Sequence, residues 1–327
     1  MNSEKIKHHI QDSGSGSKSD FAIQNQTNAQ RVCLSPAKVN LFLKVLSKRN
    51  DGYHNIVSIV SPVSLYDVIY FEKQDNEIVI VEDNKNCLPE GQANTIYKAV
   101  MLLKKRYGIN KGLKVYVEKH IPIGSGLGGP SSNAAAVLRE LPNLWGLNIN
   151  HTDLVEIGKE IGADVPLFLN DGPCVIRGIG EKVLPIELPR LWYLIIYPDV
   201  AIRTPDVYGG LKIVLTKGEN DIKLRKNFES VQEVADILEN DLEKVAILMC
   251  PKIKILKEKL IDAGAFGALM SGSGSSVFGI FEEEEQAKKA LISFGNTNSA
   301  FIAHSIEKGD LYGHNRYQDF SGRREES

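Results

Sequence analysis

The segment IPIGSGLGGPSSNAAAVL, residues 121–138, leads from a predicted strand through a glycine-rich loop into a predicted helix. Glycine lets the backbone approach a phosphate group closely, and the free N–H groups and dipole of a helix N-terminus attract the anion. Helix capping is a structural alternative for the serines at the helix start. We therefore predict a phosphate site whose residues are Gly124, Ser125, Gly126, Leu127, Gly128, Gly129, Ser131, Ser132 and Asn133.

The surroundings of this loop exclude three known kinds of phosphate loop. A Walker A loop ends in Gly-Lys-Ser/Thr, whereas this loop ends in Gly-Gly-Pro-Ser. A dinucleotide-binding loop requires a strand that ends in an acidic residue about 20 positions later, but a second helical stretch occupies that region. A protein-kinase loop lies between two strands, whereas this one opens a helix. The loop therefore belongs to another class.

The composition is that of a globular protein that acts on small molecules. The 327 residues include 39 Lys and Arg and 41 Asp and Glu, which leaves a net charge of −2. A nucleic-acid binder usually carries a basic excess on one face, so this class is disfavoured. The longest apolar run, residues 191–197, is far shorter than the roughly 20 residues that cross a bilayer. We expect a cytoplasmic protein with no nucleic-acid or membrane partner.

Strand-like and helical runs alternate between residues 31 and 306, which predicts an α+β architecture. In the first half, the predicted strands are 39–48, 56–72, 77–82 and 112–122, and the predicted helices are 94–107, 131–144 and 151–162. The second half is predicted as a strand at 191–202, two helices within 240–264, two strands around a glycine turn within 265–281, a helix at 282–294 and a strand at 299–307. The polar ends predict a disordered leader at 1–30 and a flexible tail at 307–327, around domains at 31–188 and 189–306.

Three separated segments resemble the three motifs of the GHMP kinases, the superfamily of galactokinase, homoserine kinase and mevalonate kinase. They are PAKVNLFLKV at 36–45, the glycine loop at 121–138 and MSGSGSSVFGIF at 270–281. The resemblance covers residues 31–306 and implies a domain like the second domain of ribosomal protein S5, followed by a ferredoxin-like domain, with the active site between them. It also implies ATP as the phosphoryl donor, with Mg²⁺ carried by the nucleotide.

A finer resemblance is to the branch of this family that phosphorylates the 2-hydroxyl of 4-diphosphocytidyl-2-C-methyl-D-erythritol in the non-mevalonate isoprenoid pathway. It rests on RNDGYH at 49–54, IGADVPLFL at 161–169 and RTPDVY at 203–208. It implies that Tyr53 stacks on the cytosine base, that His54 forms hydrogen bonds with the base edge, and that Tyr208 closes the other face. The structural alternative for each is an ordinary core or surface position.

The same resemblance implies a catalytic pair. Asp164 resembles the aspartate that takes the proton of the acceptor hydroxyl, and Lys38 resembles its partner. An ammonium beside a carboxylate holds the carboxylate ionised and orients the hydroxyl. Composition alone favours the structural alternatives, in which Asp164 caps a turn before Val-Pro and Lys38 is a solvated strand residue, but the shared motifs reverse this preference.

Further contacts follow from the resemblance. Asn40 is expected at the erythritol end of the acceptor. Gly272 and Gly274 let the second glycine turn approach the substrate, although a tight hairpin turn is the alternative. Asn94 and Lys119 are expected on the adenine side, with a helix cap and a solvated strand charge as alternatives. Ser125 and Pro130 depart from the family loop, which usually has Gly or Ala at the first position and Gly at the second.

No metal ligand is assigned. The acidic run at 282–285 is explained by the dipole of a helix start. The four cysteines are spaced too widely for a zinc or redox motif and are predicted to be free thiols, at positions Cys33, Cys87, Cys174 and Cys250.

Three other functions remain open. Another alcohol acceptor, such as homoserine or mevalonate, is disfavoured by DGYH, because those acceptors carry no base. A non-catalytic nucleotide sensor of the same fold has no need of both Lys38 and Asp164. A nicotinamide-dependent oxidoreductase is the weakest alternative. The predicted partner is a small cytidine diphosphate substrate, and the predicted state is a monomer or weak homodimer.

Overall fold

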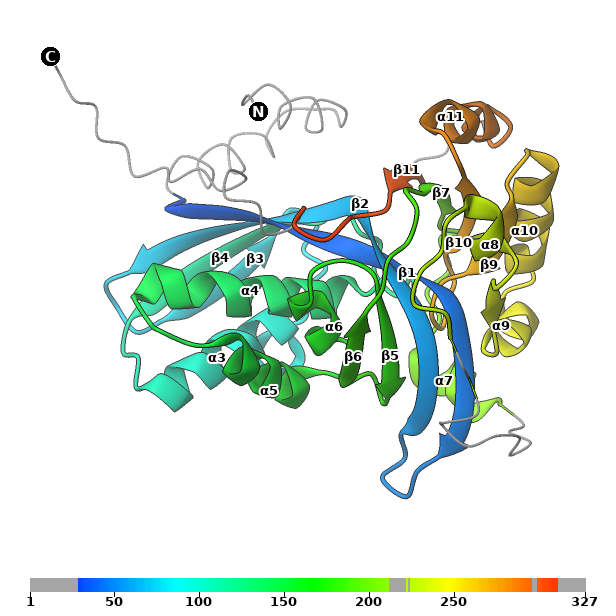
Figure 1. Cartoon of the computed structure of the whole chain (residues 1–327). Coiled ribbons are helices and arrows are strands. Elements are labelled where there is room, and N and C mark those ends of the chain that lie inside the picture. The colour runs from blue at the N-terminus through cyan, green and yellow to red at the C-terminus, as the bar shows by residue number, and fades with distance from the viewer. Residues whose placement is uncertain (1–28, 212–221, 223, 296–298, 311–327) are drawn as a thin grey trace, which may run out of the picture.

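The computed structural model describes residues 29–211, 222, 224–295 and 299–310. The chain forms two sheets, each covered by helices, and two long strands curve from one sheet toward the other (Figure 1). These are β1 (Arg31–Lys48) and β2 (His54–Gln74), which pair antiparallel along most of their length. The central hairpin therefore connects the two halves of the molecule.

The larger sheet has seven strands. Its order is β3-β4-β2-β1-β8. In addition, β5 pairs with residues 56–60, near the N-terminal end of β2, and β6 pairs with β5. The remaining strands are β3 (Val79–Asp83), β4 (Gly112–Glu118), β5 (Cys174–Gly178), β6 (Lys182–Pro185) and β8 (Glu239–Asn240). Because β8 comes from the second half of the chain, its parallel pairing with β1 ties the halves together at Phe42 and Leu43.

Four helices cover one face of this sheet. They are α3 (Thr95–Tyr107), which follows the 3-10 turn η1 (Gly91–Ala93), α4 (Gly129–Trp145), α5 (His151–Ile161) and α6 (Val165–Leu169). Residues 134–138 of α4 are fully buried, and three of them are alanines, which lets α4 pack closely against α3 and β1. The start of α4 is thereby held at the end of β4, where the glycine loop lies.

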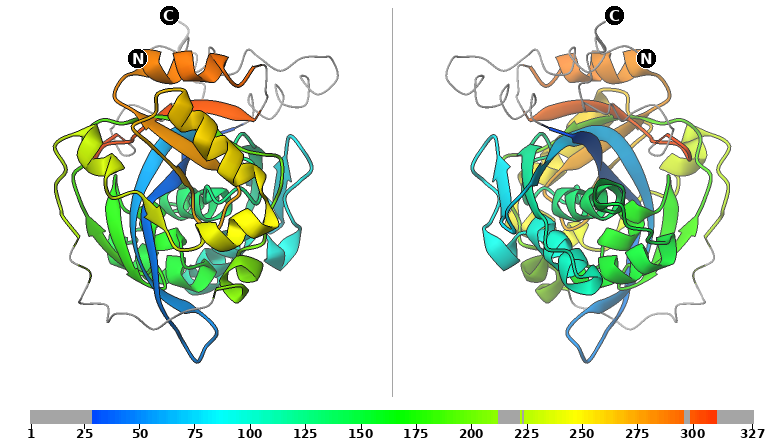
Figure 2. Two further views of the ribbon diagram at one scale, coloured as in Figure 1. Left: turned by 90° about the vertical axis from the view of Figure 1, so that its right-hand side faces the viewer. Right: turned by 90° about the vertical axis from the view of Figure 1, so that its left-hand side faces the viewer.

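The second sheet has the order β11-β7-β10-β9, and all its pairs are antiparallel. Its elements are β7 (Trp192–Ile196), α7 (Thr204–Gly209), α8 (Val231–Ala235), α9 (Glu243–Met249), α10 (Lys252–Asp262), β9 (Gly267–Met270), β10 (Val277–Phe281), α11 (Glu284–Ile292) and β11 (Ala300–His304). With α10 before β9 and α11 before β11, this is the ferredoxin-like arrangement. Helices α9 and α10 face the viewer in the left view of Figure 2 and helices α3, α4 and α5 face the viewer in the right view, so the two sets lie on opposite sides of the molecule.

The two units share an apolar core. Leu41 of β1 is fully buried in a cluster with Ile195 of β7 and Phe278 of β10. Tyr193 of β7 donates a hydrogen bond from its hydroxyl to Ser61 Oγ of β2 at 3.1 Å. The relative position of the sheets is therefore set by packing and not by a linker alone.

The α+β architecture and the main elements agree with the sequence prediction, and the differences concern strand bounds and short elements. The strands β1 and β2 extend beyond the predicted bounds, because a paired strand continues past its apolar run. A turn was expected at Asp164, but the five-residue helix α6 follows it. Helices α7 and α8 and strands β5, β6 and β8 are not among the predicted elements, because elements of two to six residues are too short for a clear pattern.

The predicted leader and tail lie largely outside the described residues. Ala29 is buried, and the backbone N–H of Gln30 donates to Phe71 O at 2.9 Å, so these two leader positions are ordered. All four cysteines are free as predicted, although Cys87 is half-buried and its Sγ lies 3.3 Å from Asp83 Oδ1. Within the described residues, no helix is long and apolar enough to span a membrane.

We predict that Leu41→Ala lowers the free energy of unfolding by about 2–5 kcal/mol, because it leaves a cavity where the two sheets meet. Urea denaturation followed by circular dichroism measures the change. Leu248→Ala is the matched control, since Leu248 is 84% exposed and its truncation should change stability by less than about 0.5 kcal/mol. Equal effects of the two variants would show that the shared core does not support the fold.

Candidate active site

Lys38 is the centre of the site. It lies on β1 with 4% of its surface exposed, so it is not the solvated strand residue of the structural alternative. Its Nζ donates to Asn40 Oδ1 at 2.5 Å and to Gly126 O at 2.7 Å. A buried ammonium requires such acceptors, because burial without them is strongly unfavourable.

Asp164 is the charged group that acts on Lys38. Burial lowers the pKa of Lys38 below its ordinary value of 10.5, and the negative charge of Asp164 opposes this shift. Asp164 is half-buried at the position before α6, and its side chain makes no capping hydrogen bond. The charge of Asp164 therefore acts on Lys38 through space, and the carboxylate makes no hydrogen bond to the helix end.

The glycine loop has a backbone that side chains would not permit. Gly124, Gly126 and Gly128 have φ values of +65°, +78° and +76°. A Cβ atom on Gly126 would lie 2.2 Å from Ser271 O, and one on Gly128 would lie 2.8 Å from the ring of Phe168. These glycines are therefore required both by conformation and by close packing.

The start of α4 is anchored to β1. Ser35 Oγ lies 2.7 Å from both Ser132 Oγ and Asn133 Oδ1. The N-cap residue is Gly128, so the serine cap of the structural alternative does not form. Pro130 lies within the first turn, where its missing N–H removes no helical hydrogen bond. Ser131, half-buried, and the buried Nδ2 of Asn133, which has no partner among the described residues, face this end of the helix.

The second glycine turn packs directly on Lys38. A Cβ atom on Gly272, where φ is +56°, would lie 2.9 Å from Lys38 Nζ. Gly274 differs, because its Cβ would meet Met270 Sδ at 2.6 Å and not a site residue. Asn240 Nδ2 donates to Met270 O at 2.9 Å and to Gly272 O at 2.8 Å. Asn240, which sequence reasoning missed, thus holds the turn in place.

The glycine loop and the second unit are also joined by polar contacts. Ser276 N donates to Ser125 O at 3.0 Å, and Ser125 Oγ donates to Pro122 O at 2.6 Å. Next to them, Thr204 Oγ1 and Ser273 Oγ lie 2.8 Å apart. Ser125, a position at which this loop departs from the usual family sequence, therefore stabilises the loop backbone.

Two of the three residues predicted to contact the cytosine base, His54 and Tyr208, lie against each other. The rings of His54 and Tyr208 are stacked, with centroids 4.9 Å apart and an interplanar angle of 29°. Burial and the charge of Asp164 raise the pKa of Tyr208, so this side chain lies within electrostatic reach of Asp164. Burial and Lys48 lower the pKa of His54, so its imidazole is neutral at pH 7. Tyr53, on the turn between β1 and β2, is 56% exposed.

Asn94 and Lys119 have internal partners. Asn94 Oδ1 accepts from Ile96 N at 2.9 Å and caps α3, as the structural alternative proposed. Lys119 is 2% exposed and forms an ion pair with Asp67, so it is not a solvated charge. Asp67 also accepts from the backbone N–H groups of His120 and Ile121, just before the glycine loop. This buried carboxylate had no recognisable sequence signal.

Other features do not compete as sites. Among the described residues, no group of three or more His, Cys, Asp or Glu side chains is placed to hold a metal ion. Glu283 and Gln286 form a capping box, which confirms the helix-start explanation of the acidic run.

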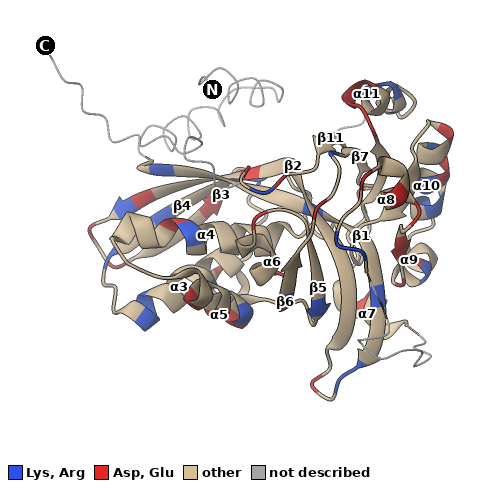
Figure 3. Cartoon of the chain, in the orientation of Figure 1, with Lys and Arg blue, Asp and Glu red and all other residues tan. Residues whose placement is uncertain are grey.

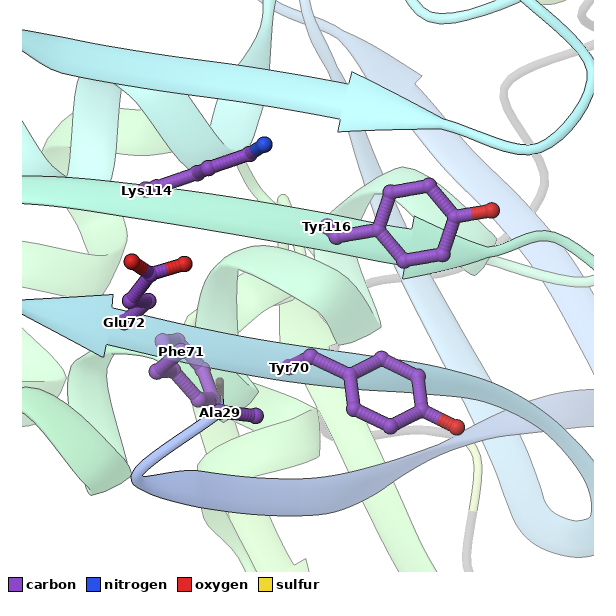
Figure 4. Close-up of a pocket in the computed structure, with 6 residues that line it drawn as sticks. All are labelled: Ala29, Tyr70, Phe71, Glu72, Lys114 and Tyr116. Atoms are coloured by element: carbon purple, nitrogen blue, oxygen red, sulfur yellow. The ribbon is translucent and has the colours of Figure 1, made fainter. Parts of the chain in front are cut away.

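Acidic and basic residues are interspersed over the ribbon (Figure 3). A pocket of ≈ 10 Å³ on β2 and β4, between Tyr70 and Tyr116, holds no more than about one water (Figure 4).

Comparisons with known proteins agree with this geometry. The family model of the GHMP kinases N terminal domain matches residues 94–172, and that of the GHMP kinases C terminal domain matches residues 224–296. The 4-diphosphocytidyl-2-C-methyl-D-erythritol kinase of Syntrophotalea carbinolica is 39% identical over 275 residues, which are 84% of this chain and 97% of that protein. The chain belongs to the 4-diphosphocytidyl-2-C-methyl-D-erythritol kinase family. The relative from Caldicellulosiruptor saccharolyticus, with the same name, is 41% identical over 78% of this chain and 89% of its own length.

Solved structures lead to the same family. A crystal structure of 4-(cytidine 5'-diphospho)-2C-methyl-D-erythritol kinase has a TM-score of 0.69 and 31% identity, and covers 84% of this chain and 99% of that one. The homoserine kinase of Cytophaga hutchinsonii, at 21% identity and a TM-score of 0.63, shares the fold and covers 86% of this chain and 95% of its own. The predicted GHMP kinase fold and family are confirmed.

We predict that Gly126→Ala destabilises the protein and weakens nucleotide binding, because its Cβ would push the loop away from Ser271. Gly146→Ala is the matched control: Gly146 has φ +71° at the end of α4, but a Cβ there meets nothing within 4 Å. Both variants should lose about 1–2 kcal/mol of stability through φ alone. In a titration with a fluorescent ATP analogue, the affinity should fall at least tenfold for Gly126→Ala and stay unchanged for Gly146→Ala. Equal affinities of the two variants would contradict the role of the loop in nucleotide binding.

Proposed function

We propose that this protein transfers the γ-phosphoryl group of ATP to the 2-hydroxyl of 4-diphosphocytidyl-2-C-methyl-D-erythritol. The observation that carries the proposal is the buried Lys38 ammonium, held by Asn40 and Gly126 and electrostatically coupled to Asp164. Lys38 lies between the two glycine turns, in a member of the 4-diphosphocytidyl-2-C-methyl-D-erythritol kinase family. A non-catalytic sensor would not need to bury a lysine at such a cost.

The reaction requires a base for the acceptor hydroxyl. As the acceptor oxygen forms its bond to the γ-phosphorus and the bond to the ADP oxygen breaks, the hydroxyl proton passes to Asp164. Lys38 offers positive charge to the transferring group. Two N–H groups of the Lys38 ammonium donate to Asn40 Oδ1 and Gly126 O, which leaves the third N–H to interact with the transferring phosphoryl group.

The phosphates of ATP belong at the start of α4. The left-handed glycines let the loop backbone pack closely against Ser271 and Phe168 at the start of α4, and the helix dipole attracts the anion there. Ser131 and Asn133 add polar groups from the first turn. Mg²⁺ is proposed to arrive with ATP and to be held mainly by the phosphates, whose charge it offsets.

The acceptor is proposed to enter beside the aromatic residues. The His54 and Tyr208 rings are held as one stacked unit, with an imidazole edge for hydrogen bonds to the cytosine and a tyrosine face for packing. Tyr53 is exposed and close in sequence to this unit, so it is proposed to stack on the base. Asn40 remains the proposed contact to the erythritol end. One N–H of its side-chain amide donates to Ser58 Oγ, and the other N–H is proposed to donate to the acceptor.

The proposal includes the finer predictions on organisation. Domains are proposed at residues 31–188 and 189–306, which places each sheet largely in its own domain. A cytoplasmic location and a monomer or weak homodimer also remain proposals. Gel filtration with light scattering measures the last of these directly.

We predict that Asp164→Asn lowers kcat by at least about 10³-fold, because the amide cannot take the hydroxyl proton. ATP affinity should change less than about twofold, since the nucleotide site does not contain this carboxylate. A coupled assay of ADP release and a nucleotide titration measure the two quantities. Asp262→Asn, on the exposed end of α10, is the control, and retained turnover by Asp164→Asn would refute the assignment of the base.

A second prediction concerns the acceptor. ADP release from Mg-ATP should occur with 4-diphosphocytidyl-2-C-methyl-D-erythritol and be absent with the same acceptor lacking cytidine, with homoserine and with mevalonate. Tyr53→Ala should raise KM for the cytidylated acceptor about tenfold through lost stacking, with kcat nearly unchanged. Turnover of homoserine or mevalonate would retain a kinase and reject this acceptor. Binding of ATP without turnover of any acceptor would favour the sensor.

A further inference from the structure

Ser58 occupies a buried place behind the catalytic lysine. It lies in β2, is 0% exposed, and stands opposite Leu43 of β1. Its Oγ donates to Phe42 O at 2.5 Å and accepts from Asn40 Nδ2 at 2.8 Å. The pairing of β1 with β2 shifts register between Asn40 and Phe42, and at this irregularity the hydroxyl reaches both residues.

The polarity of this hydrogen-bond chain is determined by its two ends. A backbone carbonyl can only accept, so the Ser58 hydroxyl must donate to Phe42 O and present a lone pair to Asn40. The Asn40 side chain must then turn its NH2 group to Ser58 and its carbonyl oxygen to Lys38. An ammonium can only donate, so this is the one amide orientation that suits both neighbours. The Lys38 ammonium is thus oriented from Phe42 O through two neutral side chains.

We propose that Ser58 is a positioning residue which, through the amide of Asn40, aims the Lys38 ammonium at the reacting groups beside Asp164. This inference rests on the proposed function, in which Lys38 and Asp164 act on the acceptor hydroxyl. Ser58 itself does not touch the substrate.

Removal of the hydroxyl has a defined consequence. Without its acceptor, the amide of Asn40 is free to rotate and present NH2 to Lys38, where two donors oppose each other. The ammonium then loses a buried acceptor, which disfavours its charged form. The groups that pack around Lys38 from the glycine loop and the second glycine turn, at Gly126 and Gly272, are neutral backbone. Among the described residues, Asp164 is the charge that opposes deprotonation.

The test compares Ser58→Ala with Ser61→Ala. Ser61 is also 0% exposed on β2, but its Oγ accepts from Tyr193 and takes no part in the chain to Lys38. Both variants lose one buried hydroxyl, so both should lose some thermal stability. Ser58→Ala should lower kcat about tenfold, with KM for ATP within about twofold. Ser61→Ala should leave kcat unchanged.

The pH dependence separates positioning from simple destabilisation. A lower Lys38 pKa moves the alkaline limb of the kcat profile to lower pH in Ser58→Ala, because the ammonium is lost sooner as pH rises. The limb should stay in place in Ser61→Ala. Ser58→Thr keeps the hydroxyl on a β-branched residue suited to a strand, and should restore both kcat and the limb. If Ser58→Ala does not fold, Ser58→Cys retains the volume with a weaker hydrogen-bonding group and should shift in the same direction.

A second measurement tests the chain without any acceptor. An NMR titration of isotope-labelled lysine reports the Lys38 pKa in the unliganded protein, with Lys38→Arg to assign the signal. A lower pKa in Ser58→Ala but not in Ser61→Ala supports the positioning role even if the wild type fails to phosphorylate the cytidylated acceptor, an outcome that would reject only the proposed function. An unchanged pKa in Ser58→Ala, or equal kcat in the two variants, would overturn the inference.

Discussion

The buried ammonium of Lys38 is the constraint on which the site depends. A charge with 4% exposure is tolerated when acceptors surround it, and Asn40 and Gly126 supply them at 2.5 and 2.7 Å. Each acceptor must itself be held in place. Asn40 is oriented by Ser58, while Gly126 O also accepts from Ser271 Oγ at 3.0 Å. The need to satisfy one cation therefore joins β1, β2, the glycine loop and the second glycine turn.

The two glycine turns have different physical tasks. In the first, left-handed glycines shape the backbone around the start of α4, which suits an anion. In the second, Gly272 removes a side chain that would collide with Lys38 Nζ. Asn240 supports this turn from strand β8, which pairs with β1. The site is therefore built by residues of both units, and the apolar core that the units share holds them in a fixed relative position.

The sequence predicts much of this arrangement, and the predictions that fail concern the burial of single residues. The strands and longer helices follow from periodicity, and the Lys38 and Asp164 pairing follows from family resemblance. The alternatives assigned to single residues were less reliable: Lys38 and Lys119 are buried, whereas Asn94 is a helix cap as the alternative held. A lysine in a strand has the same local pattern in either case. Its burial depends on what packs over it from distant parts of the chain.

The sequence by itself determined the α+β class, the two glycine turns and the family, because these depend on local periodicity, backbone conformation and short motifs. Tertiary structure alone decided which polar groups meet. Ser58, Asp67 and Asn240 carry no motif, since a single polar residue in a strand has no periodic or spacing signal. Their partners are chosen by strand register, by the bulge near Leu41 and by the packing of the second sheet on β1. Such contacts are long-range, so local sequence cannot specify them.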